Sequence, residues 1–111
     1  MALGNVQERI KAYDEAILLN PLALEKHRTK GIAYGRLGQY EQDVENQTRA
    51  IELNSGFHEA FSERGDVHFF LGEYQLAFAD YTEAIRLEPN QVLYYGNRAI
   101  AHALLGLNPE M

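Results

Sequence analysis

Residues 65–89 read GDVHFFLGEYQLAFADYTEAIRLEP, and the pattern in this stretch recurs along the whole chain. Its Leu-Gly pair is one of four, each 34 residues after the last: Leu3-Gly4, Leu37-Gly38, Leu71-Gly72 and Leu105-Gly106. The same spacing relates Ala16, Ala50 and Ala84; Ile17, Ile51 and Ile85; Leu19, Leu53 and Leu87; and the basic series Lys30, Arg64 and Arg98. A repeat with a period of 34 residues therefore organises the chain.

Each period contains two segments whose apolar residues recur at helical spacing, and no segment alternates as a strand does. Asn5 with Glu8 three residues later fits a capping box at the start of the first helix. Gly38, Gly72 and Gly106 stand where a helix is expected to end and the chain to reverse. The sequence predicts an all-α fold with helices near 5–19, 22–37, 40–53, 57–71, 74–87 and 91–105, separated by breaks at Asn20-Pro21, Asn54-Ser55 and Glu88-Pro89.

Gly31 and Gly65 lie inside predicted helices, where glycine costs up to about 1 kcal/mol relative to alanine. A residue without a side chain lets a neighbouring helix approach closely. We expect the large partner to be an aromatic residue of the following helix, such as Tyr40 or Tyr74. This small-against-large pairing favours stacked helical hairpins.

A set of small and aromatic residues at these spacings resembles the tetratricopeptide repeat: Gly31, Tyr34, Gly38, Tyr40, Ala50, Leu53, Gly65, Gly72, Tyr74, Ala77, Tyr81, Ala84 and Pro89. The resemblance covers essentially the whole chain and implies a right-handed solenoid of antiparallel helical hairpins. It divides residues 1–111, as one domain, into a second helix at 1–21, repeats at 22–55 and 56–89, and a first helix at 90–111. The chain departs from the motif at Asp43, Gln47 and Ser55.

On this division the chain reads as a solenoid cut at both ends. The helix near 91–105 carries Val92, Leu93, Ile100 and Leu104 without a hairpin partner. Natural arrays end in a polar cap, and neither end helix has one. We therefore expect a dimer or small oligomer formed through exposed end helices.

The composition narrows the function. A net charge of −6 disfavours nucleic-acid binding, and no apolar run is long enough for a membrane helix. No signal peptide is visible, so we expect a cytoplasmic protein. The chain has no cysteine and no phosphate-binding loop or nucleophile motif, so we expect neither an enzyme nor a cofactor.

The resemblance implies a scaffold or adaptor that holds a partner peptide or helix in a concave groove lined by the first helices of the repeats. The predicted groove residues are Arg28, Arg36, Glu59, Glu63, Asp66, Phe69, Phe70, Asn97, Ile100 and Leu104. Along the groove, these residues are first of mixed charge, then acidic, and finally apolar. Such a surface suits a basic partner with an apolar anchor. Alternatively, Phe69 or Phe70 fills a gap between repeats and the acids are only solvated.

Family members that bind the acidic tails of heat-shock chaperones use a clamp of Lys, Asn and Arg. Arg28 can stand for one lysine, but Ile32 and Glu63 fall where asparagines are needed. Leu93 and Asn97 fall where Lys and Arg are needed, so the clamp is not expected here.

Three further readings remain open. His68 and His102, with Asp66, are residue types that bind metal ions. Tyr34, however, stands at the equivalent position of the previous repeat, which favours a packing role for the histidines. Lys30, Arg64 and Arg98 favour a row of ion pairs, with Asp80 as a candidate partner. As alternatives to a scaffold or adaptor, the chain would be a self-assembling unit, or a regulatory or substrate-selecting arm of a larger enzyme.

Overall fold

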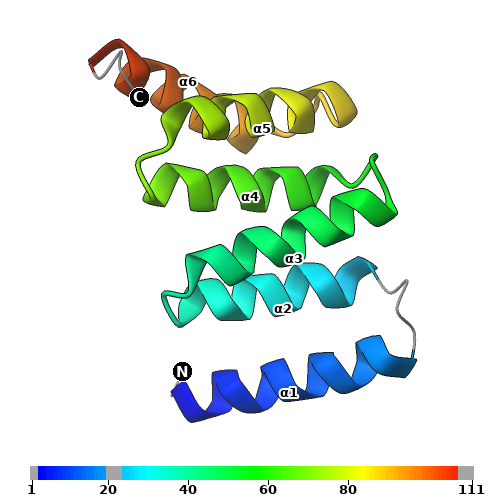
Figure 1. Cartoon of the computed structure of the whole chain (residues 1–111). Helices are drawn as coiled ribbons and strands as arrows, with labels where there is room; N and C mark the ends of the chain where they lie inside the picture. Colours follow the sequence, from blue (N-terminus) through cyan, green and yellow to red (C-terminus); the bar gives the residue numbers. More distant parts are fainter. Residues whose placement is uncertain (1–2, 20–23, 108–111) are drawn as a thin grey trace. The chain divides into compact units, whose positions relative to one another are not determined.

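The computed structural model describes residues 3–19 and 24–107. These residues form six helices and no strand: α1 (Leu3–Leu19), α2 (Leu24–Arg36), α3 (Tyr40–Leu53), α4 (His58–Phe70), α5 (Tyr74–Leu87) and α6 (Val92–Leu107) (Figure 1). The all-α prediction is confirmed. The predicted break at Asn20-Pro21 and the start of the helix predicted at 22–37 lie outside the described residues.

The two inner hairpins turn as predicted. Gly38 and Gly72 both have φ of 78°, a conformation that glycine adopts without strain. In each turn the residue after the glycine donates a backbone hydrogen bond back into the helix, from Gln39 N to Tyr34 O at 3.0 Å and from Glu73 N to His68 O at 2.8 Å. These bonds satisfy carbonyl groups that the helix end leaves open.

Two predictions at the outer helices are wrong. Helix α1 begins at Leu3, so Leu3-Gly4 lies in a helix and Asn5 is not its N-cap. Helix α6 continues through Gly106 to Leu107, and Gly106 has no positive φ. A Leu-Gly pair permits a turn but does not impose one, because glycine also adopts helical angles.

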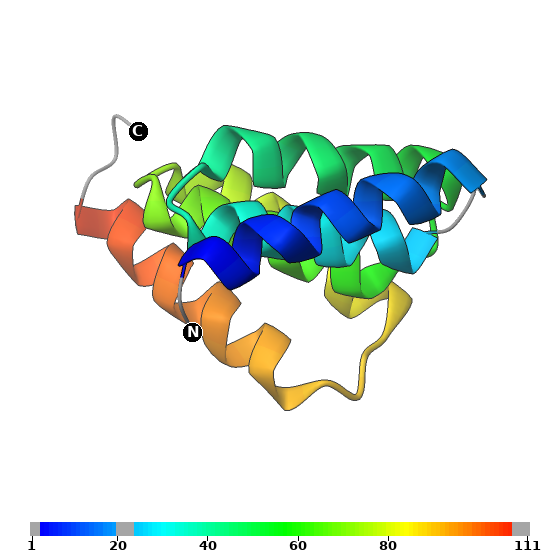
Figure 2. The same ribbon diagram turned by 90° about the horizontal axis from the view of Figure 1, so that it is seen from below.

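The helices belong to two compact units, residues 1–55 (unit 1) and residues 56–111 (unit 2). In unit 1, α2 packs against α1 and α3; in unit 2, α5 packs against α4 and α6. Figure 2 shows the connection from α5 into α6, where the chain leaves the helix at Glu88. The hydroxyl of Tyr95 donates to Pro89 O at 2.9 Å and ties α6 to this connection.

Unit 2 has an apolar core, whereas the α2–α3 contact in unit 1 is polar. Tyr81 packs with Ala77 and Ala101, against Phe69 and Phe78. In unit 1, Asp43 and Gln47 are buried, and Gln47 Nε2 donates to Arg28 O and to Asp43 Oδ1 at 2.9 Å each. The substitutions that depart from the family motif thus create a hydrogen-bonded contact in place of an aromatic one.

The expected partners of the helix glycines are wrong. A methyl group at Gly65 would lie 2.9 Å from Tyr81 Cε1, and one at Gly31 would lie 2.6 Å from Gln47 Nε2. In an antiparallel hairpin the middle of one helix faces the middle of the other. Tyr74 follows the turn directly, so its ring contacts Phe69 near the helix end, with centroids 5.4 Å apart.

The basic row forms separate contacts. Arg64 binds Asp80 through two hydrogen bonds of 2.9 and 2.8 Å, which confirms Asp80 as its partner. Lys30 pairs with Asp14, and the Arg98 guanidinium lies over the Phe78 ring, 5.7 Å from its centroid. This row is therefore engaged within the units.

Candidate functional site

A hollow of about 320 Å³ opens between α4 and α6 in unit 2, with α5 behind it. We call it the unit 2 hollow. Five of the ten predicted groove residues line it, together with Tyr81: Asp66, Phe69, Phe70, Asn97 and Ile100. Half of the predicted groove residues therefore lie at one surface of unit 2.

Helix geometry places these side chains. Asp66, Phe69 and Phe70 stand at positions i, i+3 and i+4 of α4, so they share one face. Asn97 and Ile100 have the i, i+3 relation on α6. The Tyr81 ring fills the space beside Gly65, and this packing fixes the position of its hydroxyl.

Asp66 supplies the negative charge of the hollow. Its Oδ1 accepts a hydrogen bond of 2.6 Å from the Tyr81 hydroxyl. Burial raises the pKa of Asp66, and the hydrogen bond from Tyr81 offsets part of that increase. The pKa of Tyr81 is also raised, first by burial and then by its bond to Asp66, with the charges of Glu63 and Asp80 adding to the effect. The hydroxyl therefore remains a donor to the carboxylate.

The apolar side chains divide into two roles. Phe69 packs against the core of Ala77, Tyr81 and Ala101 and also lines the hollow. Phe70 is 71 % exposed and Ile100 is 53 % exposed. Asp66 is half-buried and hydrogen-bonded, so it is not merely a solvated acid. The hollow thus combines exposed apolar surface with a partly desolvated carboxylate.

The other predicted residues of unit 2 do not line this hollow. Glu59 Oε1 lies 3.2 Å from His58 Nε2 at the start of α4. Glu63 is half-buried one turn before Asp66, and its charge acts on Tyr81. Leu104 is half-buried one turn beyond Ile100.

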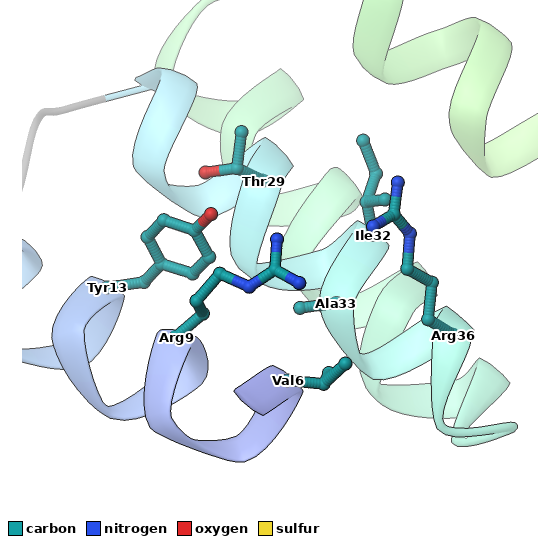
Figure 3. A pocket seen from close by; sticks show the side chains of 7 residues that line it. All are labelled: Val6, Arg9, Tyr13, Thr29, Ile32, Ala33 and Arg36. Atoms are coloured by element: carbon teal, nitrogen blue, oxygen red, sulfur yellow. The ribbon is translucent and has the colours of Figure 1, made fainter. Parts of the chain in front are cut away.

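Arg28 and Arg36 belong to unit 1. Arg28 is paired with Glu25 on its own helix, at 3.1 Å. Arg36 lines a hollow of about 170 Å³ between α1 and α2, which we call the unit 1 hollow (Figure 3). Its lining is Val6, Arg9, Tyr13, Thr29, Ile32, Ala33 and Arg36.

The two hollows occupy equivalent places in the repeat. Tyr13 and Tyr81 are two periods apart, as are Thr29 and Asn97, and Ile32 and Ile100. The sequence prediction missed Tyr81, Arg9 and Tyr13 as lining residues because it considered only the first helix of each repeat. The 34-residue period itself was the signal that could have found them.

His68 and His102 make separate contacts. His68 Nδ1 lies 2.9 Å from Glu73 Oε1, while the His102 ring packs against Phe78 with centroids 5.7 Å apart. Within residues 3–19 and 24–107, no group of three or more His, Cys, Asp or Glu side chains could hold a metal ion. None of the described helices is long and apolar enough to cross a membrane.

Two family models, both described as tetratricopeptide repeat, match residues 29–57 and 58–91. The matches are contiguous and span more than half of the 111 residues. The chain belongs to the tetratricopeptide repeat family. This family consists of protein-interaction modules rather than enzymes, so the chain is a module that binds a protein or peptide.

Solved structures show the same fold. The first tetratricopeptide domain of Spaghetti (RPAP3), bound to the HSP90 peptide SRMEEVD, is 25% identical with a TM-score of 0.88, over 93% of this chain and 82% of that one. The second such domain of human RPAP3, with the HSP70 peptide SGPTIEEVD, is 24% identical with a TM-score of 0.82, over 89% and 82%.

A third solved structure, the MamA protein, is 23% identical with a TM-score of 0.85, over 95% of this chain and 57% of that one. The second RPAP3 domain and MamA are less than 25% identical to this chain, so their similarity shows the fold alone. A search of curated proteins found no match to the chain.

Proposed function

We propose that this tetratricopeptide module is a scaffold or adaptor that holds a partner peptide in the unit 2 hollow. The peptide carries a large apolar side chain beside a lysine or arginine. The observation that carries the proposal is the position of Phe70 and Ile100, both more than half exposed, beside the Asp66 carboxylate. Apolar contact provides the binding energy, and the carboxylate selects the neighbouring cation.

The volume supports one apolar anchor rather than a large ligand. About 320 Å³ is at the small end of the range for small-molecule sites. A bound cation favours the ionised form of Asp66, so its charge offsets the desolvation that raises the pKa of this half-buried carboxyl. Asn97 adds an amide that can bond the peptide backbone.

Acidic peptides such as the one bound to the Spaghetti domain fit this hollow less well. Asp66 presents negative charge in the hollow itself, the charge of Glu63 acts on Tyr81 beside it, and like charges in a partly buried site repel. The overall charge of −6 also favours a basic protein partner over nucleic acid.

The variants Phe70→Ala and Asp66→Asn test the site. Each should weaken a short peptide with adjacent lysine and phenylalanine by about 10-fold, since each removes one of the two contacts. Isothermal titration calorimetry on the intact chain measures the change. Leu76→Ala, at a 50 % exposed leucine outside the hollow, is the matched control and should bind as the wild type does. Equal affinities for all four proteins would refute the site.

The affinity should also depend on pH. The raised pKa of Asp66 means that part of the population is protonated at acidic pH, and a bound cation favours the ionised form. Affinity should therefore rise as the pH increases from 3.8 through the raised pKa and level off above it. Asp66→Asn should lose this dependence, whereas a slope unchanged in that variant would assign it to another group.

A second candidate function is self-association through α6. Val92 is 82 % exposed and Leu93 is 73 % exposed, and burying such side chains yields about 1.5–3 kcal/mol each before ordering costs. Light scattering over a dilution series should show a dimer or small oligomer that Leu93→Glu converts to monomer. A monomeric mass at the highest concentration would remove this candidate.

A further inference from the structure

We propose that the unit 1 hollow is an oxyanion site, which binds a carboxylate or phosphate group carried by a peptide beside an aliphatic side chain. Its lining has two arginines, Arg9 and Arg36, and no acidic residue. This site is separate from the unit 2 hollow and does not depend on the function proposed there.

The two arginines reach the hollow from different helices. Figure 3 shows Arg9 extending from α1 toward α2, with Tyr13 and Thr29 on one side and Ile32 and Arg36 on the other. Neither arginine has a hydrogen bond or ion pair to another residue of 3–19 or 24–107. In a chain of net charge −6, it is unusual for two cations to line one hollow with no counter-ion among the residues that the structure describes.

None of the carboxylates on the same two helices lines the hollow, and two of them, Asp14 and Glu25, are engaged elsewhere. Asp14 of α1 pairs with Lys30, and Glu25 of α2 pairs with Arg28. An incoming oxyanion would therefore supply the negative charge that the lining of this hollow lacks. The planar guanidinium matches carboxylate and phosphate oxygens through two parallel N–H donors, and such charge-assisted bonds are the strong ones.

The remaining lining defines what accompanies the anion. Val6 and Ala33 are buried and form an apolar floor with the half-buried Ile32. The volume of about 170 Å³ is below that of typical small-molecule sites, so the hollow suits one side chain and its anionic neighbour. Tyr13 adds a hydroxyl at the edge.

The repeat supports a division of labour between the units. At the two-period spacing that relates the two hollows, Arg9 corresponds to Ala77 and Arg36 to Leu104. The two cations of the unit 1 hollow thus have apolar counterparts in unit 2, where the hollow carries the Asp66 carboxylate instead. The ligands of the two hollows should have opposite charges.

The test is an NMR titration of the intact chain with inorganic phosphate and with acetate, at constant ionic strength. The Nε–H resonances of Arg9 and Arg36 should shift saturably, while that of Arg49, which pairs with Glu52 at 3.7 Å, should not. Arg9→Gln and Arg36→Gln should each weaken the interaction by about 10-fold. Arg49→Gln, with the same change of charge, should leave it unchanged.

Peptides identical except for glutamate, phosphoserine or glutamine beside a leucine then identify the source of the oxyanion. Stronger binding of either anionic peptide than of the glutamine peptide supports the site and names its ligand. Equal binding of all three overturns it, as does a linear shift of all three arginines, which is charge screening alone. Phe70→Ala should leave these shifts intact, so this result is independent of the unit 2 site.

Discussion

Replacing Tyr81 with alanine should lower the free energy of unfolding by about 3–5 kcal/mol. The side chain is 2 % exposed and lies at the centre of the unit 2 core, against the space left by Gly65. Its loss leaves a cavity and removes the donor to the half-buried Asp66. Domains are stable by only about 5–15 kcal/mol, so this one change should remove much of the stability of unit 2.

Urea denaturation followed by circular dichroism measures this effect. Tyr81→Phe is the matched control, because it keeps the ring and loses only the bond to Asp66; we expect a cost of about 1–2 kcal/mol. Tyr95→Ala, at a tyrosine that is 42 % exposed, should cost less than Tyr81→Ala. If Tyr81→Ala were no more destabilising than Tyr95→Ala, the placement of Tyr81 in the core would be wrong.

Removing Arg64 should have the next largest effect, about 3 kcal/mol for Arg64→Leu. The Asp80 side chain is only 9% exposed and accepts two hydrogen bonds from Arg64, so the variant leaves a buried carboxylate without its main partner. His68 Nε2, at 3.8 Å, is too distant to replace the guanidinium.

The double variant Arg64→Leu with Asp80→Leu should recover part of the loss, because it removes the stranded charge. Arg86→Leu breaks the exposed pair with Glu83 on the same unit and should change stability little. The same denaturation experiment decides the outcome. A double variant less stable than Arg64→Leu alone would contradict the account of this ion pair.

The helices that could be predicted most closely from the sequence are those that follow a turn glycine. Both bounds of α3 and α5 agree with the prediction, because Gly38 and Gly72 force the chain to reverse immediately before them. The outer bounds of α1 and α6 could not be found in this way. Gly4 and Gly106 carry the same signature but remain helical, and periodicity alone does not decide which angles a glycine adopts.

The packing partners of the helix glycines could not be predicted from the sequence, because they depend on how the helices are placed in three dimensions. The sequence indicated that Gly65 admits a large side chain, but the register of the hairpin selects Tyr81 rather than Tyr74. The part of the unit 2 hollow that α4 contributes could be predicted, because helical spacing places Asp66, Phe69 and Phe70 on one face. That Phe69 packs inward while Phe70 remains exposed depends on the position of α5, which no pattern within α4 contains.

The most direct test of the central claim compares two peptides on the unmodified chain. They are identical and contain one phenylalanine, except that its neighbour is lysine in one and glutamate in the other. NMR titration should show the lysine peptide binding about 10-fold more tightly, with the largest shifts at Asp66, Phe70 and Ile100. Tighter binding of the glutamate peptide at those same residues would contradict the account.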